Sequence, residues 1–474
     1  MIPFLKKPTT PTPIVFFNTL GKKKEEFKPL SGRNIKMYTC GPTVYDYVHI
    51  GNLRSFVFAD LLRRTLEYAG YEVKQVMNIT DVGHLVGDGD DGEDKMTAGL
   101  KREGKALTLE NMKELAERYA TLFIDDLAKL NVETPFILPR ASEHVAEQIA
   151  FITTLLQKGY AYQTHDGVYF DIGKFPAYGI LGGDGSALHS RIGVNAEKHD
   201  SRDFSLWKND AKLGWDAPWG KGFPGWHIEC TAMSTKYLGK SFDIHTGGID
   251  LIPIHHNNEI AQAEAVSGKP YVKYWMHGAF ITIEGKRIGK SEGNAIRLYQ
   301  LTERGMHPLS YRYLLLTAHY RQTMNFTWEA LEAAQTARER LLRVFADLPL
   351  GGLINSAYRS RFEAAIYDDL NTAEAIAVLW ELVKDEKISL GEKRATLADF
   401  DRVLGIGLGQ APEGGEEVMV SVLSEEVQAL VERRVHARKE NRFADADALR
   451  HELKQRGFEV DDTVAGQVLR KAGP

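Results

Sequence analysis

Apolar positions along the first third of the chain predict a βαβ unit. Apolar, β-branched runs at 35–39 and 73–79 flank a segment, 55–69, in which apolar residues recur every 3.6 positions. The two runs are typical of buried strands, and the segment between them is typical of an amphipathic helix. Because such a unit commonly opens a doubly wound fold, we expect a Rossmann-like α/β domain with a parallel sheet.

The pattern changes further along the chain and predicts several domains. From 134 the sequence loosens into short segments containing Gly, Asp and Trp, which indicates a domain inserted into the parallel-sheet domain. From about 327 it is almost wholly helical, and a Gly-rich break at 405–415 precedes the last segment. The resulting divisions are 1–133 and 224–272 for the two halves of the parallel-sheet domain, 134–223 for the inserted domain, 273–326 for a connecting region, 327–405 for a helical bundle and 418–474 for a small C-terminal domain.

Length and composition agree with a multidomain protein in aqueous surroundings. The 474 residues exceed what one hydrophobic core organises, and the 43% hydrophobic and 26% charged content is ordinary for globular proteins. No apolar run reaches the length of a membrane span, so we expect no membrane partner. Residues 1–13 lack the apolar core and cleavage site of a secretory signal, which predicts a cytoplasmic location. The absence of coiled-coil heptads favours a monomer.

Charge and cysteine content narrow the possible roles. The formal net charge of −5 argues against a protein that coats nucleic acid through bulk positive potential, so any RNA contact must come from local basic patches. The chain has only two cysteines, Cys40 and Cys230, which excludes a disulfide framework. Thiols this scarce suggest a specific use.

A first motif lies in the connection between the first predicted strand and the first predicted helix. The segment 40–52 reads CGPTVYDYVHIGN. Gly51 permits close backbone approach, the helix N-terminus presents free N–H groups, and His49 and Asn52 can donate hydrogen bonds to phosphate oxygens. A nucleoside triphosphate fits such a site. Taken alone, the same pattern is more often an ordinary strand–helix turn with one buried histidine.

A second motif places a lysine in a glycine-containing loop. Residues 285–294 read GKRIGKSEGN after the apolar run 280–283, so Lys290 lies between two glycines and near other cations. A flexibly held ammonium group there can follow the negative charge that develops on a pyrophosphate leaving group. An isolated loop of this kind is usually a solvated basic turn. The presence of both motifs in this order favours the functional interpretation.

A third set of residues has the chemistry of a metal site. Cys230 lies near the start of the second half of the sheet domain, and His255 and Glu259 are spaced so that their side chains share one face of a helix. With Cys40 they supply two sulfurs, a nitrogen and an oxygen, a set suited to zinc. Spacing alone leaves open that the two cysteines are buried structural thiols.

The segment 243–250 predicts another strand that ends in a glycine turn and an acidic residue. Gly247 and Gly248 can admit an adenosine or amino-acid group, and Asp250 can accept a hydrogen bond from a ribose hydroxyl or an amine. A simple connection between a strand and a helix has the same pattern.

Taken together, the motifs resemble those of the cysteinyl-tRNA synthetase family, within class I of the aminoacyl-tRNA synthetases. HIGN at 49–52 is similar to the HIGH signature of class I, and RIGKS at 287–291 occupies the place of the KMSKS loop. The segments NITD at 78–81, WHIEC at 226–230 and HHNNEIAQ at 255–262 resemble the cysteine enzymes specifically. The resemblance extends from about residue 15 to the C-terminus.

The resemblance implies a two-step reaction with ATP (as its Mg²⁺ complex), L-cysteine and tRNA(Cys), and one zinc ion per chain that recognises the substrate thiol. It implies that the helical bundle binds the anticodon stem, that 273–326 contacts the tRNA stem, and that the C-terminal domain recognises the anticodon. The implied roles are zinc ligation by Cys40, Cys230, His255 and Glu259, catalysis by His49, Asn52 and Lys290, ATP binding by Thr43, His49, Gly51, Asn52, Gly248, Asp250 and Lys290, and substrate binding by Gly41, Thr80, Trp226 and His227.

Three departures from the family signatures fall in the ATP motifs. Asn52 replaces the second histidine of HIGH, Arg287 replaces the first lysine of KMSKS, and Gly289 replaces a serine. Asparagine keeps a donor and arginine keeps the charge, so the chemistry is expected to survive. Two rivals stay open: a ligase that transfers cysteine to an amino sugar in mycothiol synthesis, which would not need the helical C-terminal half, and a noncatalytic paralogue.

Two further features each allow two interpretations. The acidic segment 81–95 is either a solvated turn or a metal-binding loop. The basic residues of the last segment either contact RNA or form a salt-bridged solvent face with neighbouring acidic groups. These residues are Arg433, Arg434, Arg438, Lys439 and Arg442.

Overall fold

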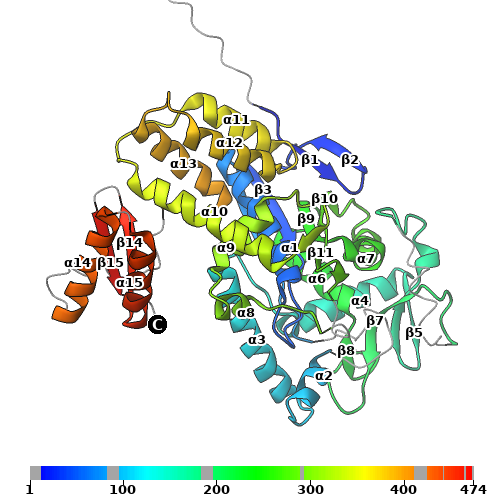
Figure 1. Cartoon of the computed structure of the whole chain (residues 1–474). Coiled ribbons are helices and arrows are strands. Elements are labelled where there is room, and N and C mark those ends of the chain that lie inside the picture. Colours follow the sequence, from blue (N-terminus) through cyan, green and yellow to red (C-terminus); the bar gives the residue numbers. More distant parts are fainter. Residues whose placement is uncertain are drawn as a thin grey trace, which may run out of the picture.

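The computed structural model describes residues 12–82, 95–182, 196–288, 293–409, 424–440, 442–463 and 466–471. Figure 1 shows a central sheet surrounded by helices, a helical bundle next to it, and a small C-terminal unit. Within these ranges, no helix combines the length and the apolar character needed to cross a membrane.

The central sheet consists of four parallel strands, β3 (Asn34–Thr39), β4 (Glu72–Met77), β9 (Phe242–Gly248) and β10 (Val272–Gly278), in the order β10-β9-β3-β4. The chain passes from β3 to β4 on one side of the sheet and from β9 to β10 on the other. The direction of winding therefore reverses between β3 and β9. In open α/β sheets, ligands bind outside the carboxyl ends of the strands at such a reversal.

Alternation of side chains along the strands explains why helices cover both faces. Met37 and Met276 belong to the core that includes α1 (Ile50–Tyr68), whereas Tyr38 and Trp275 belong to a second core. That second core receives apolar side chains from two other helices. They are α6 (Trp226–Leu238) and α7 (Asn257–Ser267). Successive strand residues point to opposite faces, so each face requires its own apolar cover.

Helix α1 begins earlier than the apolar periodicity predicts, at residue 50 rather than 55. His49 is the N-cap, and its imidazole accepts a hydrogen bond from the main-chain N–H of Asn52 (3.2 Å) while the Asn52 side chain accepts from the N–H of His49 (3.3 Å). This reciprocal capping satisfies two otherwise free donors. Gly51 and Asn52 interrupt the apolar pattern in the first turn, although Ile50 and Leu53 are buried there.

The part of the chain between β4 and β9 forms a separate, antiparallel sheet. Its strands are β5 (Ala161–Thr164), β6 (Gly167–Phe170), β7 (Phe204–Asn209) and β8 (Gly222–Pro224), in that order. Phe170 and Trp207 pack in a separate core with the preceding helix, α4 (Val145–Gln157), which the loose sequence pattern did not predict. Two short 3-10 turns, Ala141–His144 and Ile172–Lys174, complete this part.

From residue 328 to residue 404 the chain is mainly helical, as its composition predicts. A small sheet of order β12-β11-β13 is formed by segments that precede this bundle of four helices. The bounds are β11 (Ile281–Ile283), β12 (Lys286–Arg287), β13 (Met324–Phe326), α8 (Leu298–Glu303), α9 (Pro308–Leu316), α10 (Trp328–Asp347), α11 (Ser356–Tyr367), α12 (Thr372–Lys384) and α13 (Leu390–Leu404). The remaining elements of the main body are β1 (Val15–Asn18), β2 (Lys23–Glu26), α2 (Lys95–Arg102) and α3 (Leu109–Lys129).

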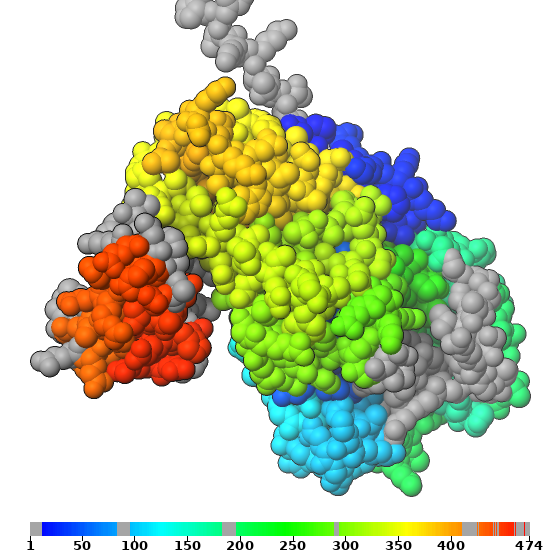
Figure 2. Space-filling view, viewed as in Figure 1, coloured from blue at the N-terminus to red at the C-terminus, as the bar shows by residue number. Residues whose placement is uncertain are grey.

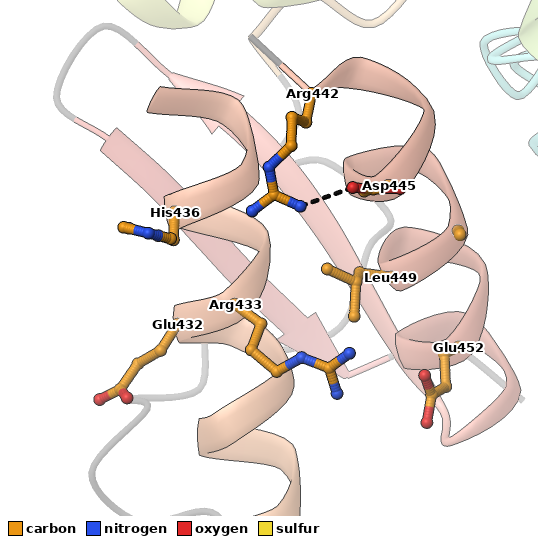
Figure 3. Close-up of a pocket in the computed structure, with 8 residues that line it drawn as sticks. Glu432, Arg433, His436, Arg442, Asp445, Leu449 and Glu452 are labelled. Atoms are coloured by element: carbon orange, nitrogen blue, oxygen red, sulfur yellow. Dashed lines mark hydrogen bonds and ion pairs between the residues drawn. The ribbon is translucent and has the colours of Figure 1, made fainter. Parts of the chain in front are cut away.

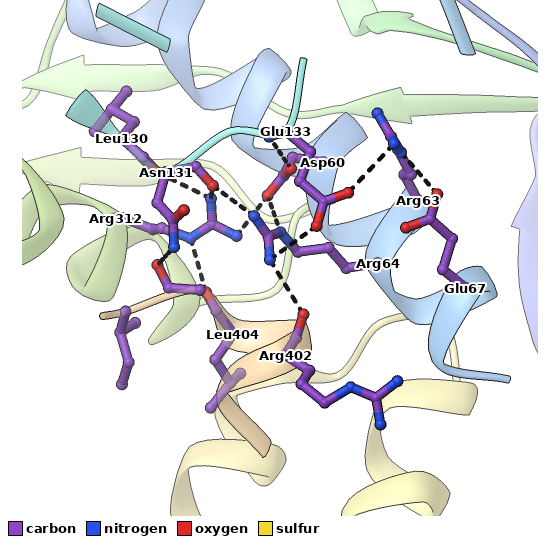
Figure 4. Close-up of polar contacts among 12 residues, drawn as sticks. Asp60, Arg63, Arg64, Glu67, Leu130, Asn131, Glu133, Arg312, Arg402 and Leu404 are labelled. Carbon is purple, nitrogen blue, oxygen red and sulfur yellow. Dashed lines mark hydrogen bonds and ion pairs between the residues drawn. The ribbon is translucent and has the colours of Figure 1, made fainter. Parts of the chain in front are cut away.

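Buried charges join the bundle to α1 (Figure 4). Arg312 on α9 donates to the Asp60 carboxylate of α1 at 2.6 Å, to the Leu404 carbonyl at the end of α13 at 2.7 Å, and to the carbonyls of Leu130 and Asn131 at 3.0 Å each. The C-terminal ends of helices carry partial negative charge, which favours a buried cation there. The junction therefore ties three helices to the helix that carries the first motif.

The C-terminal unit, orange and red in Figures 1 and 2, has a core of its own. It consists of α14 (Glu425–Lys439), α15 (Phe443–Gln455) and a hairpin of β14 (Phe458–Thr463) and β15 (Gly466–Lys471). Arg434 is fully buried in it, so this residue does not belong to an exposed RNA-binding patch. Between the two helices lies a charged groove in which Arg442 donates to Asp445 (Figure 3).

Candidate functional site

A cavity of about 430 Å³ opens at the carboxyl ends of β3, β9 and β10, where the winding of the sheet reverses. Residues from each of these strand ends and from the first turn of α1 line it. The predicted site residues among them are Cys40, Gly41, Thr43, His49, Gly51, Asn52, Trp226, Cys230, Gly248, Asp250 and His255. The fold thus gathers residues that lie more than 200 positions apart in the sequence.

Four predicted metal ligands meet at the base of this cavity. Cys40 follows β3, Cys230 lies on α6, His255 lies in a π-helical turn (Ile252–His256), and Glu259 lies on α7. One ligand atom from each lies within 4.8 Å of the others. His255 and Glu259 approach to 3.0 Å, as their spacing predicts, although the π-helical turn replaces the expected α-helical one. Such π-helical turns are frequent at functional sites.

The donor set fits a zinc ion. It offers two sulfurs, an imidazole nitrogen and a carboxylate oxygen, and three of the four residues are fully or almost fully buried. His255 Nε2 is buried and forms no hydrogen bond of good geometry, despite its proximity to Glu259. A buried nitrogen in that state among thiol and carboxylate groups is the arrangement that a cation completes.

Protonation within the donor set favours anions. Burial and the neighbouring Cys230 raise the pKa of Cys40, whereas the hydrogen bond from Cys40 lowers the pKa of Cys230 to about 6. Burial opposes ionisation of Glu259, but the imidazoles of His245 and His255 outweigh it and lower its pKa to about 2. These shifts in pKa favour a thiolate at Cys230 and a carboxylate at Glu259. Both are the charged forms that bind a metal ion.

A row of buried histidines that sequence reasoning missed lies behind the donor set. His245 on β9 lies 2.9 Å from the Glu259 carboxylate, and His256 lies 3.4 Å from Cys40 Sγ and 2.7 Å from His277 on β10. Cys40, His245, His256 and Glu259 form a second group within 4.8 Å of one another. Burial lowers the pKa of His277 to about 3, so this imidazole is neutral. In the sequence, only the pair of adjacent histidines at 255–256 indicated such a row. His245 and His277 lie within apolar strand segments, where a histidine does not stand out.

Two of the predicted substrate-binding residues lie behind the cavity lining. Thr80 donates to the buried Glu229 carboxylate at 3.0 Å and accepts from the Asn78 side chain. His227 is buried and its Nδ1 lies 2.8 Å from Nδ1 of His255. Both are placed to orient other groups. Trp226, in contrast, lines the cavity, and its ring centroid lies 4.2 Å from that of His255.

The glycines of the site lie close to neighbouring groups, which are main-chain atoms at Gly41 and side-chain atoms at Gly248 and Gly51. A Cβ atom on Gly41 would lie 1.6 Å from the Asn78 carbonyl oxygen, and one on Gly248 would lie 2.2 Å from an oxygen of Asp250. At Gly51 it would lie 2.7 Å from the Ile288 side chain. Gly41 therefore allows β3 and the chain after β4 to meet below Cys40.

The predicted ATP residues meet at the N-terminus of α1. His49, Gly51 and Asn52 lie on the cavity wall with Thr43, at the end of α1 where the helix dipole is positive. The mutual capping of His49 and Asn52 uses one hydrogen-bonding group of each side chain. Lys290 lies outside the described residues, as does most of the acidic segment, 83–94.

Comparison with known proteins agrees with this geometry. Residues 26–336 match the family model of the catalytic domain of class I (C) tRNA synthetases, 361–408 match a DALR domain, and 421–470 match the anticodon binding domain of cysteinyl-tRNA ligases. A cysteine–tRNA ligase 1 of Burkholderia lata is 47% identical over 470 residues, which cover 96% of this chain and 97% of that protein. A cysteine–tRNA ligase of Treponema denticola is 40% identical, with 96% and 99% covered.

Solved structures show a shared fold at low identity. Methionyl-tRNA synthetase of Mycobacterium tuberculosis, in complex with methionyl-adenylate, superimposes with a TM-score of 0.54 at 14% identity and covers 79% of this chain and 90% of that one. Together with the parallel sheet and the helical bundle, this confirms the predicted fold class. The resemblance inferred from the motifs is confirmed as well, and the chain belongs to the cysteinyl-tRNA synthetase family of class I aminoacyl-tRNA synthetases.

Proposed function

We propose that this chain is a cysteine–tRNA ligase that uses ATP to activate L-cysteine and then esterifies the 3′ end of tRNA(Cys). The observation that carries the proposal is one cavity with two chemically different ends. The buried group of Cys40, Cys230, His255 and Glu259 lies at its base, and the N-terminus of α1 lies on its wall. The first suits a thiol-containing amino acid and the second suits a triphosphate.

In the first step, a carboxylate oxygen of cysteine attacks the α-phosphorus of ATP, and the bond from that phosphorus to the bridging oxygen of pyrophosphate breaks. ATP enters as its magnesium complex. His49, Asn52 and the positive end of the α1 dipole attract the phosphate oxygens, and we assign Lys290 to the charge that develops on pyrophosphate. Thr43, Gly51, Gly248 and Asp250 complete the ATP site, since they line the same cavity. Positioning and charge stabilisation suffice for this chemistry.

Selection of cysteine belongs to the base of the cavity. Zinc held by the four ligands would favour an ionised thiol over the hydroxyl of serine, which makes an editing site unnecessary. His227 orients His255 through the contact between their rings, and Trp226 forms the adjacent wall. Gly41 and Thr80 bring the two strand ends together beside Cys40. The row of buried histidines orients Glu259 through the contact of His245 with its carboxylate.

In the second step, a hydroxyl of the terminal ribose of the tRNA attacks the carbonyl carbon of cysteinyl-adenylate, loses its proton, and AMP leaves with the bonding electrons. The helical bundle and the C-terminal unit, which follow the catalytic part, are assigned to the anticodon stem and the anticodon. Exposed Arg433 and Arg438 on α14 are candidates for contacts with phosphate groups.

The test is cysteine-dependent exchange of pyrophosphate into ATP, with serine as a competing substrate and with zinc measured on the same protein sample. Exchange with cysteine alone and about one zinc per chain, as one tetrahedral site would hold, would support the proposal. Absence of exchange despite bound zinc would favour a noncatalytic paralogue. Exchange without charging of tRNA(Cys) would direct attention to a different acceptor, such as an amino sugar.

The domain divisions and the surroundings of the enzyme are part of the proposal. We retain the divisions at 133, 223, 272, 326, 405 and 418 from the sequence pattern. We further propose a cytoplasmic monomer. Light scattering on the purified protein tests the oligomeric state, and a mass of twice 53.2 kDa would contradict the proposed monomer.

A further inference from the structure

Arg54 is a buried arginine on α1 that does not contact the cavity. It lies five residues after the capping histidine, and its side chain is only 5% exposed. Its guanidinium donates to the main-chain carbonyls of Ala279 (3.0 Å), Phe280 (2.6 Å), His319 (3.2 Å) and Gln322 (2.6 Å). All four acceptors are main-chain oxygens of two segments that are distant in sequence.

Both segments lead into the small sheet of β11, β12 and β13, of which β11 and β12 directly precede residues 289–292. Strand β11 begins directly after Phe280, and β13 begins two residues after Gln322. The two strands pair in parallel, and β12 pairs with β11 and ends at Arg287. Arg54 therefore holds the starting points of two strands of this sheet against the helix that carries His49 and Asn52.

The chain beyond residue 292 also returns to the beginning of α1. The N–H of Ile50 donates to the carbonyl of Ile296 at 2.8 Å, and His49 and Arg297 form an isolated β-bridge. On the entering side, Ile288 contacts Gly51 so closely that a Cβ there would clash. Residues on both sides of the segment that contains Lys290 thus contact the beginning of α1.

We propose that Arg54 is a positioning residue for adenylation, which acts by fixing the base of the β11–β12 hairpin at the phosphate-binding end of α1. The inference rests on the proposed function, because it assigns the hairpin to the delivery of Lys290. Displacement of a catalytic group by about 1 Å can lower a rate by about a hundredfold. Lysine is not equivalent to arginine here, since one ammonium group cannot span acceptors on two segments in a planar fork.

The chain contains a matched control. Arg63 lies on the same helix, is 17% exposed, and also donates to a main-chain carbonyl, that of Thr134 at 2.8 Å, and to Glu67 at 2.9 Å. It contacts neither the hairpin nor the cavity. Arg63→Met therefore reports what the loss of a partly buried arginine on α1 costs without any change at the hairpin.

The experiment compares Arg54→Lys, Arg54→Met and Arg63→Met in the full chain loaded with zinc. For both Arg54 variants we expect kcat of cysteine-dependent pyrophosphate exchange to fall by about 10- to 100-fold, with KM for ATP and cysteine changed by less than about threefold. Transfer of cysteine from preformed enzyme-bound adenylate to tRNA, measured in a single turnover, should stay within about twofold of the unsubstituted protein, because pyrophosphate has already left. Arg63→Met should leave both half-reactions unchanged.

The half-reactions distinguish positioning from general damage. Equal losses in activation and transfer, or a loss carried by KM, would overturn the proposal and assign Arg54 to structure alone. Unchanged activation in Arg54→Lys and Arg54→Met would overturn it as well. If the unsubstituted protein and Arg63→Met also lack exchange, the proposed function fails, which is a separate result. Thermal unfolding of each variant identifies any protein that is not folded. If Arg54→Met does not fold, Arg54→Lys, which keeps the positive charge, still tests the proposal.

Discussion

The guanidinium of Arg312 and the carboxylate of Asp60 lie 2.6 Å apart, and both side chains are completely buried. Arg64, one turn along α1, donates to the same carboxylate at 2.8 Å and to the Asn131 carbonyl at 2.8 Å. Asp60 is therefore the acceptor that two buried cations share. The catalytic helix and the end of the bundle meet at this carboxylate, so its neutralisation should be costly (Figure 4).

Asp60→Asn should lower the free energy of unfolding by about 3–5 kcal/mol, because it leaves the buried Arg312 guanidinium without its counter-charge and removes one of the two carboxylates that pair with Arg64. Arg361→Met provides the comparison, since Arg361 pairs with Glu381 at the surface and should cost less than about 1 kcal/mol. Denaturant unfolding measures both. A change below about 1 kcal/mol for Asp60→Asn would show that the junction is not a significant source of stability.

The metal proposal distinguishes two neighbouring donor groups. Cys230→Ser and His255→Gln should reduce zinc from about one per chain to less than about a tenth after dialysis, because each removes a ligand. His256→Gln should retain the metal, because His256 belongs only to the second group. Elemental analysis of the dialysed proteins decides between the two donor groups. Loss of zinc from His256→Gln, with zinc retained by Cys230→Ser and His255→Gln, would place the metal in the second group.

His199→Gln is the control for the metal measurement. His199 lies near Asp171 and Asp203 in the inserted sheet region, a third cluster with ligand-type atoms. The carboxylate of Asp203 already accepts from Tyr162 at 2.7 Å and from two main-chain N–H groups. The zinc content of His199→Gln should therefore equal that of the unsubstituted protein.

Gly41→Ala should inactivate the enzyme and destabilise it. Its Cβ would lie 1.6 Å from the Asn78 carbonyl oxygen, and main-chain atoms on both sides must separate to relieve the clash. Overpacking typically costs about 1–3 kcal/mol, and displacement of Cys40 should abolish pyrophosphate exchange. Gly409→Ala has no neighbouring atom within 4 Å and should leave exchange unaffected. Exchange by Gly41→Ala above about a tenth of the normal rate would contradict the close packing proposed here.

The stability of the main body should depend on Asp126. Burial raises the pKa of this carboxyl group on α3 to about 6, above its ordinary value of 3.8. The unfolded chain therefore releases the proton more readily than the folded one, and stability falls as pH rises from about 4 to about 6. Asp126→Asn should raise the melting temperature at pH 8 and leave it nearly unchanged at pH 3. Asp125→Asn, at the neighbouring position, should not produce this pH-dependent gain. Equal effects of Asp126→Asn at both pH values would contradict the assignment.

Local patterns were sufficient for much of the fold and of the site. The strands at 34–39 and 72–77 and the helix between them follow from alternation and helical periodicity, since these patterns report which side of an element is buried. The spacing of His255 and Glu259 brought the two side chains together as predicted. Motif order indicated the family, which the comparisons confirmed.

The sequence by itself therefore determined the α/β class and the family, because both depend on the order and chemistry of short segments. Only the tertiary structure decided which distant groups touch. The contacts of His245 with Glu259, of Arg312 with Asp60 and of Arg54 with four carbonyl groups join elements that the sequence separates. They arise from how helices pack on the two faces of a twisted sheet, and no local pattern encodes that packing.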